Sequence, residues 1–283
     1  MGYGDDLLIT KLASKVKKQF PDRQIVIGEA KNQSAYHSIV YDNNPNISDC
    51  RNLEKSKPTH IIDYHPYNRP YIDYEKSTNT NYVWKKFKPN PGEIYFTKKE
   101  KVDAKKIILE AIKFWRRSNK KNYKKIIFLE TSSTKIHDRQ FSIKHQNKDW
   151  GAKNWQKLID VLTKDFLVIK SVHNESKKNL SVFSPNNMDF RLACAVLNEA
   201  DFYVGPEGGF GHVAAALNKK AVLYFGGWIN PDAIGYDFHQ NIYYEHNLSP
   251  CGEYKKLCSH CEEARKKITV DVFLKHINKI SSN

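Results

Sequence analysis

A glycine-rich turn between an apolar run and an alanine-rich run is the strongest chemical signal in the sequence. Tyr203-Val204 predicts the end of a strand and residues 209–217 predict a helix, with Gly205-Pro206-Glu207-Gly208-Gly209 between them. Glycines let the backbone approach a ligand, and the free N–H groups of a first helical turn attract an anion. Glu207 favours a hydroxyl-bearing group, such as a sugar, beside that anion. The alternative is an ordinary tight turn with a surface glutamate, and the spacing alone does not separate the two interpretations.

Three cysteines near the C-terminus have the residue type and spacing of metal ligands. Cys258 and Cys261 form a Cys-x-x-Cys pair, and Cys251 lies just upstream. These thiolates and one histidine, His246 or His260, would complete a tetrahedral site. Reduced thiols without a metal are the alternative, and both remain open. The odd total of 5 cysteines does not indicate a disulfide framework.

The elements that must position these residues are clearest in the second half of the chain. Short apolar runs alternate there with segments of helical spacing. The apolar runs lie at residues 125–130, 166–169, 202–204 and 221–225, and the helical segments lie at 150–164, 188–200 and 209–217. Continuously apolar strands that alternate with helices predict a parallel sheet covered on both faces.

The first half has a similar but looser pattern. Helices are predicted over residues 7–20 and 104–115, and strands over 25–27, 38–41, 60–62 and 93–96. Residues 64–92 are rich in Tyr, Asn and Pro and predict a long surface loop, a kind of segment that often carries specificity. The basic stretch 116–122 is a natural linker, so we expect one domain over residues 1–122 and a second over 123–283.

Composition sets the class of protein and its partners. With 283 residues and 40% apolar residues, the chain can build two cores. It has no apolar run of membrane-spanning length and no signal peptide, so we expect a soluble, cytoplasmic protein. The net charge of +15 favours anionic partners, although lysines scattered by a compositional bias explain it equally well. No nucleic-acid-binding motif is present, so no nucleic acid is expected as a partner.

The glycine-rich segment resembles glycosyltransferase family 9, whose best-known members are the heptosyltransferases. The family pattern is Gly-Pro-Asp-Ser/Thr-Gly, then His, an Ala-rich helix and Phe-Gly, which matches Gly205 to Gly209, His212 and Phe225-Gly226. In the family the acidic residue holds the donor sugar's hydroxyls and the amides after it hold the diphosphate. The resemblance therefore implies that the substrate-binding residues are Glu207, Gly208, Gly209, Phe210, Gly211 and His212. Here Glu replaces Asp, which alters the fit to the sugar, and Gly208 replaces Ser/Thr, which removes one phosphate contact.

Two further segments resemble the same family. Lys148-Asp149-Trp150, followed by Trp155, matches its Lys-x-Trp and Trp-x-x-Leu, which implies that Lys148 neutralises the leaving diphosphate. Taken alone, Lys148 is one more lysine in a lysine-rich chain. Gly4-Asp5, followed by an apolar helix, matches the opening of the family, which implies that Asp5 is the general base.

Asp6 is the alternative base, and two carboxylates that stabilise a helix N-terminus are the alternative to a catalytic role. In the family a strand precedes Gly-Asp. Only residues 1–3 do so here, so we expect that the first sheet lacks this strand or that the sequence starts late.

The resemblance implies an α/β protein of two Rossmann-like domains with parallel sheets facing a cleft, the GT-B arrangement. The donor would lie on the C-terminal domain and the acceptor on the N-terminal one. The implied reaction is an inverting transfer of a heptose or related sugar from a nucleoside-diphosphate sugar to a glycan, a lipopolysaccharide-type lipid-linked acceptor or a protein. Such a reaction belongs in the cytoplasm, including the inner membrane surface.

No cofactor is required for this transfer. Some relatives that glycosylate proteins place an iron in such a cysteine cluster, so a structural zinc or iron at Cys251, Cys258 and Cys261 is an alternative to free thiols. A nucleotide-sugar epimerase and a non-catalytic sugar-nucleotide-binding protein are the alternatives to transfer. The absent strand and the altered motif residues favour the binding protein.

Overall fold

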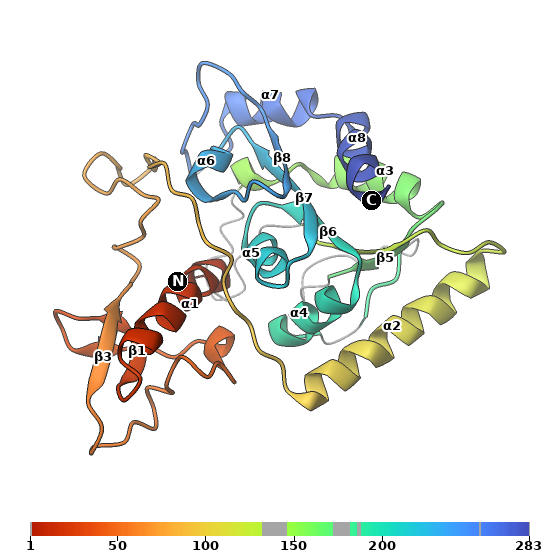
Figure 1. Cartoon of the computed structure of the whole chain (residues 1–283). Coiled ribbons are helices and arrows are strands. Elements are labelled where there is room, and N and C mark those ends of the chain that lie inside the picture. Colours follow the sequence, from red (N-terminus) through yellow and green to blue (C-terminus); the bar gives the residue numbers. More distant parts are fainter. Residues whose placement is uncertain (1, 132–145, 172–181, 186–187, 255, 283) are drawn as a thin grey trace.

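Two α/β halves of unequal size make up the molecule (Figure 1). A computed structural model describes residues 2–131, 146–171, 182–185, 188–254 and 256–282. The smaller half holds the first three strands and the larger half the other five. Among the described residues, no helix combines the length and apolar character that crossing a bilayer requires.

A five-stranded parallel sheet forms the centre of the C-terminal half. Its order is β5-β4-β6-β7-β8. The strands are β4 (Ile126–Leu129), β5 (Leu167–Lys170), β6 (Phe202–Pro206), β7 (Lys220–Gly226) and β8 (Gln240–Tyr243). Every residue of β4, β5 and β6 is buried, as expected for a sheet covered on both faces. The predicted parallel sheet is confirmed, and β8, which the sequence did not predict, adds an edge strand.

Helices cover both faces of this sheet (Figure 1). Helices α4 (Phe190–Glu199) and α5 (Gly209–Ala216) lie on one face, and α3 (Ala152–Leu162) and α8 (Val270–Ser281) on the other. Side chains alternate between the faces along a strand, so Phe128 joins the core beneath α5 while Ile127 and Leu129 join the core beneath α3 and α8. The two short helices α6 (Pro231–Ile234) and α7 (Ser259–Lys267) complete this half.

Helix α2 (Lys98–Ser118) is longer than the predicted 104–115, and it packs on α4 and β5 of the C-terminal half. Thr97 caps its start, where its hydroxyl accepts from Glu100 N and the Glu100 carboxylate accepts from Thr97 N. This helix precedes residue 122 in sequence yet covers the larger sheet. The division of the chain at residue 122 stays a prediction.

The N-terminal half is built on a small mixed sheet of order β2-β1-β3. Strand β1 (Gln24–Glu29) pairs in parallel with β3 (Thr59–Asp63) and antiparallel with the short β2 (Ser34–Ala35). The sheet therefore differs from the all-parallel one that we expected. Helix α1 (Tyr3–Gln19) begins at once, and no described residue before it forms a strand.

Two predicted strands of this half are wrong. Residues 38–41 form a short 3₁₀ helix, η1 (Ile39–Tyr41), because the Ser38 hydroxyl accepts from Val40 N and starts a turn. Residues 93–96 run without strand pairing, since other side chains satisfy their backbone. Glu93 N donates to Thr10 Oγ1, and Tyr95 O accepts from Arg191 Nη2.

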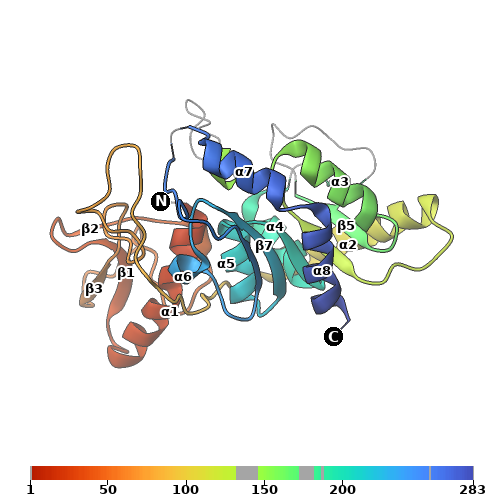
Figure 2. The same ribbon diagram turned by 90° about the horizontal axis from the view of Figure 1, so that it is seen from above.

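Helix α1 connects the two halves (Figure 2). It packs on β1 and η1 of its own half and also on α5 of the other. Leu7 and Ala13 share one core with Phe210 and Val213. A Cβ atom at Gly4 would lie 2.9 Å from His212 Cδ2 and 3.2 Å from Gly209 Cα, so only glycine fits this approach.

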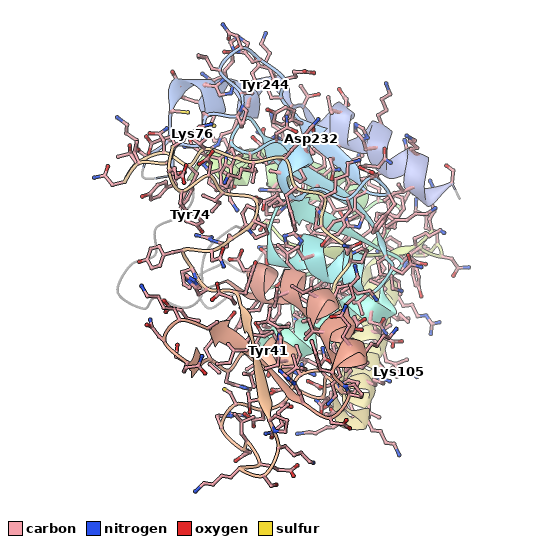
Figure 3. All side chains as sticks on the ribbon, turned by 60° about the vertical axis from the view of Figure 1, so that its left-hand side comes forward. Tyr41, Tyr74, Lys76, Lys105, Asp232 and Tyr244 are labelled. Atoms are coloured by element: carbon pink, nitrogen blue, oxygen red, sulfur yellow. The ribbon has the colours of Figure 1, made fainter. Side chains whose placement is uncertain are left out.

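Residues 64–92, called here the crossing segment, leave the N-terminal half and lie against the C-terminal one. Figure 3 shows Tyr74 and Lys76 of this segment between Tyr41 of the smaller half and Tyr244 of the larger. Phe87 N donates to Asp232 O at 2.9 Å, which ties the segment to α6. Several of its residues are buried, among them Tyr64, Tyr71 and Ile72. The predicted surface loop is therefore only partly a surface feature.

Candidate active site

The strand order places a ligand crevice at the carboxyl ends of β4 and β6. Chain connections run from β4 to β5 on one side and from β6 to β7 on the other, and open α/β sheets bind ligands where the order reverses in this way. Glu130 follows β4 and Glu207 follows β6, and each is only 4% exposed. Two carboxylates are therefore buried at the end of the sheet where a polar ligand would enter.

Glu207 and Lys148 form a buried ion pair at this place. Lys148 Nζ lies 2.8 Å from Glu207 Oε2, and the two side chains are 18% and 5% exposed. The same ammonium lies 4.4 Å from the centre of the Trp228 ring, within range of a cation–π interaction. Lys148 ends the short 3₁₀ helix η2 (Gln146–Lys148), so the fold brings together two residues that the sequence separates widely.

Gly208 turns the chain from β6 into α5. Its φ of +151° and ψ of −158° lie in a region that only glycine adopts without strain. A serine or threonine, the usual residue of the resembled pattern, would be strained at this position. The first N–H groups of α5 follow directly, and they have no carbonyl partner within the helix.

The side chains of Phe210 and His212, which were also predicted to bind the substrate, are both buried. The Phe210 side chain is 6% exposed and lies in the core, with its ring centre 5.2 Å from that of Phe128. Only its backbone is placed to meet a ligand. His212 is also buried, and its Nδ1 is hydrogen-bonded to Tyr236 OH at 3.0 Å. Burial lowers the pKa of His212 to about 4, so the ring is neutral at pH 7 and cannot act as a phosphate-binding cation.

Asp5 lies at the junction of the halves, in the first turn of α1. Tyr71 OH of the crossing segment donates to Oδ1, and Arg69 Nη1 lies 3.6 Å from Oδ2. The backbone N–H of Gly2 also donates to Oδ2, at 3.3 Å. Because Gly4 packs directly on Gly209, Asp5 is held beside the start of α5.

Asp6 has different surroundings from its neighbour. It is 4% exposed and accepts hydrogen bonds from Ser38 Oγ at 2.7 Å, Tyr36 OH at 3.3 Å and Tyr41 OH at 3.4 Å. Burial raises the pKa of Asp6 to about 6, although the hydroxyl of Ser38 opposes this shift. All three partners belong to the N-terminal half, so Asp6 is placed to organise that half.

The three cysteines near the C-terminus do meet in space. Cys251 Sγ lies 3.2 Å from Cys261 Sγ and 3.7 Å from Cys258 Sγ. In the described part of the chain no histidine joins this group, and His260 Nε2 is instead hydrogen-bonded to Ser249 Oγ at 2.8 Å. Completion of the site by His246 or His260 is therefore not observed.

Two α/β halves joined through α1 and α5, with polar groups at the sheet's switch point, define a GT-B glycosyltransferase fold. The profile of glycosyltransferase family 9 (heptosyltransferase) matches residues 113–261, more than half of the chain. The chain belongs to this family, which confirms the family that the sequence resembles, while the Gly4-Asp5 match lies outside the matched residues and stays a prediction. The protein is thus a glycosyltransferase, and the matched region contains Lys148, the glycine-rich turn and the three cysteines.

Two solved structures share the fold over nearly the whole chain. One is the iron-containing dodecameric glycosyltransferase TibC from enterotoxigenic E. coli H10407, with a TM-score of 0.61 and 14% identity over 100% of this chain and 76% of that chain. The other is a glycosyl transferase family 9 protein from Veillonella parvula DSM 2008, with a TM-score of 0.61 and 13% identity over 99% and 94% of the two chains. Among curated proteins no sequence matches.

Proposed function

We propose that the protein transfers a heptose or a related sugar, with inversion, from a nucleoside-diphosphate sugar to an acceptor hydroxyl. The buried pair of Lys148 and Glu207 beside the N-terminus of α5 is the observation that carries this proposal. A cation and a helix N-terminus suit a diphosphate, and a carboxylate suits sugar hydroxyls. Together they match both parts of such a donor.

Donor binding exchanges the partners of this ion pair. Two charges buried together are costly to desolvate, so the pair gains from a ligand that supplies further polar partners. Lys148 then faces the diphosphate while Glu207 accepts from the hydroxyls of the sugar. The amides of Gly209 and Phe210 add two donors to the diphosphate without a side chain.

Asp5 is the base in the proposed reaction. The acceptor oxygen forms a bond to the anomeric carbon while Asp5 takes the hydroxyl proton. The bond from that carbon to the diphosphate oxygen breaks, and its electron pair leaves with the nucleoside diphosphate. Lys148 and the start of α5 stabilise the negative charge that develops on the leaving group. Asp5 is favoured over Asp6 because the buried Asp6 carboxylate already accepts from three hydroxyls.

Nucleotide release from a nucleoside-diphosphate heptose, measured with and without a glycan acceptor, tests this function. We expect release that depends on the acceptor, and a fall in kcat of about 10²–10³-fold in Lys148→Met, since such charge stabilisation has this typical size. Lys153→Met, which removes an exposed lysine from the start of α3, is the matched control and should behave like the parent. Acceptor-independent conversion of the donor would favour the epimerase, and tight donor binding without any release would favour the binding protein.

We also infer that Cys251, Cys258 and Cys261 hold a zinc or an iron ion. Sulfurs bound about 2.3 Å from a tetrahedral ion lie about 3.8 Å apart, and two of the observed separations are 3.2 and 3.7 Å. TibC, which shares this fold, is described as iron-containing. The ion would cross-link the loop that follows β8 and take no part in the transfer. Near-stoichiometric metal in the parent but not in Cys258→Ser, with Cys50→Ser as the control, would support this site, and metal-free parent protein would exclude it.

A glycan, lipid-linked or protein acceptor is proposed on the side of the N-terminal half. The net charge of +15 supports an anionic acceptor or an anionic membrane surface that carries it. We therefore propose that the reaction takes place in the cytoplasm, including the inner face of the membrane. Sedimentation with anionic and with neutral vesicles tests the membrane contact. If the protein stays in the supernatant with both kinds of vesicle, the membrane contact is absent.

A further inference from the structure

The crossing segment reaches from the Asp5 carboxylate to the donor side of the molecule. We propose that Tyr71 of this segment is a positioning residue that orients Asp5 for proton transfer. The inference rests on the proposed function, because it gives Tyr71 a role only if Asp5 is the base. Residues 64–92 were expected to carry specificity, but no role for Tyr71 follows from the sequence.

The contacts of Asp5 carry the first step of the argument. An ionised carboxylate offers about four lone-pair sites. Tyr71 OH occupies a site on Oδ1, while Gly2 N–H and Arg69 approach Oδ2. One site then remains for the acceptor hydroxyl, so these contacts fix the rotation of the carboxylate and still allow it to take a proton.

The protonation of Tyr71 is the second step. Its side chain is 7% exposed, and burial raises the pKa of the phenol well above its usual value. Tyr71 therefore stays protonated at neutral pH and acts as a donor there. A phenol that stays protonated holds the Asp5 carboxylate in one orientation without competing for the acceptor's proton.

The third step is the way in which Tyr71 itself is held. Tyr71 O accepts from Lys85 N at 2.9 Å, Ile72 forms a β-bridge with Trp84, and the Tyr71 and Trp84 rings stack with centres 6.3 Å apart. Trp84 in turn packs edge-on against Trp228, with ring centres 4.7 Å apart, and its Nε1 donates to Trp228 O at 3.0 Å.

Trp228 is the ring that lies beneath Lys148. Tyr71 and Trp84 thus form a continuous series of contacts between Asp5, the residue proposed to take the acceptor's proton, and the pocket proposed for the donor diphosphate. These contacts fix the position of Asp5 relative to the C-terminal half as well as relative to α1. This arrangement keeps Asp5 aligned with the anomeric carbon of a donor that is bound there.

The variant Tyr71→Phe removes only the hydroxyl and keeps the ring in its stack. We expect kcat to fall about ten- to a hundredfold, the range for loss of a hydrogen bond to a charged group, while the KM for the donor stays unchanged. Tyr64→Phe is the matched control. Tyr64 is also buried in the crossing segment, but its hydroxyl has no hydrogen-bond partner among the described residues, so its removal should leave kcat unchanged.

A double-mutant cycle with Asp5→Asn separates positioning from a general effect on the fold. If Tyr71 acts through Asp5, Tyr71→Phe should cause no further loss in the Asp5→Asn background. An unchanged kcat in Tyr71→Phe, or an equal loss in both backgrounds, would overturn the proposal while Asp5 remains the base. Full activity in Asp5→Asn would instead refute the proposed role of Asp5, and the role of Tyr71 with it.

Discussion

Glu207 stands where the family pattern has the shorter aspartate, and its carboxylate meets Lys148 across the crevice. The contact of 2.8 Å is nearly excluded from water, so each charge depends on the other until a ligand arrives. The sequence predicted both residues for the same site from separate motifs. Their direct pairing in the absence of donor was not predicted.

Glu207→Gln should weaken the binding of the sugar nucleotide more than the binding of the free nucleoside diphosphate. A hydrogen bond to a charged group contributes about 1.5–3 kcal/mol, so we expect about a ten- to hundredfold loss of affinity for the intact donor. The loss of affinity for the free nucleoside diphosphate should be smaller. The amide keeps the shape of the side chain, and Lys148 is freed from its carboxylate partner. Calorimetric titration of both ligands measures the difference, and equal losses would mean that Glu207 acts only through Lys148.

Asp6→Asn should alter the pH dependence of stability and leave transfer intact. The pKa of Asp6 rises from 3.8 to about 6 on folding, so the folded chain binds a proton more strongly between these values. This carboxyl therefore contributes stability below pH 4 that is lost as the pH rises through about 6, a change of about 3 kcal/mol. Asparagine cannot titrate, so the variant should gain in unfolding free energy relative to the parent between pH 4 and pH 7.

The difference between the two proteins is the informative quantity in that experiment. Burial also lowers the pKa of His212 to about 4, which makes stability rise with pH over much of the same range. His212 is present in both proteins and cancels in the comparison. Urea unfolding at each pH gives the two free energies, and a constant difference from pH 4 to pH 7 would contradict the prediction.

At the scale of single elements, the start of α5 shows how backbone conformation constrains a binding motif. Gly208 has a φ of +151° and lies between a buried strand and a buried helix. The family pattern has a hydroxyl residue here, and a side chain would be strained in the backbone conformation that Gly208 adopts. The glycine at this position therefore suits the conformation of the turn.

Gly208→Ser tests this element by restoring the usual residue of the family. Space is available, since a Cβ would meet nothing within 4 Å, but the backbone conformation disfavours any side chain. We expect a loss of about 1–3 kcal/mol in the free energy of unfolding, measured in urea. Ala152→Ser, at the ordinary first turn of α3, is the control and should change stability little. A Gly208→Ser variant as stable as the parent, with tighter donor binding, would show that the turn accepts the family's residue.

At the scale of the whole molecule, Arg191 joins elements that are distant in sequence. It extends from α4, where Nε donates to Glu100 Oε1 at 2.5 Å and Nη1 donates to Ile39 O at 2.8 Å. Nη2 donates to Tyr95 O at 2.6 Å. This buried guanidinium therefore connects η1 of the small half, the entry to α2 and the large half.

Arg191→Met should destabilise the molecule strongly while keeping the length of the side chain. Removal of the guanidinium takes the donor away from the carbonyl oxygens of Ile39 and Tyr95, and Glu100 keeps its hydrogen bonds from Thr97 but loses its cation, so we expect a cost of about 2–5 kcal/mol. Thermal and urea unfolding measure the effect, and Lys106→Met, which breaks an exposed pair with Asp103, is the control with little expected change. A loss below about 1 kcal/mol would mean that the two halves do not depend on Arg191.

Local patterns in the sequence were sufficient for most of the C-terminal half. Strands β4 to β7 and helices α3 to α5 each follow from apolar runs and helical spacing, because the side chains that each segment buries form a pattern within that segment. Residues 38–41 show the limit of this reasoning. Their apolar, β-branched run suggested a strand, but the hydroxyl of Ser38 starts a 3₁₀ turn and the surrounding residues bury Asp6.

The sequence by itself determined the chemical groups of the site, the family pattern of the glycine-rich turn and the parallel sheet that carries it. Only the tertiary structure decided which groups meet. It paired Lys148 with Glu207, separated Asp5 from Asp6, buried the ring of Phe210 and brought Tyr71 to the proposed base. The physical reason is that the apolar pattern that indicates a strand or a helix lies within one short segment, whereas these pairings depend on how α1, α5 and the crossing segment pack across two halves.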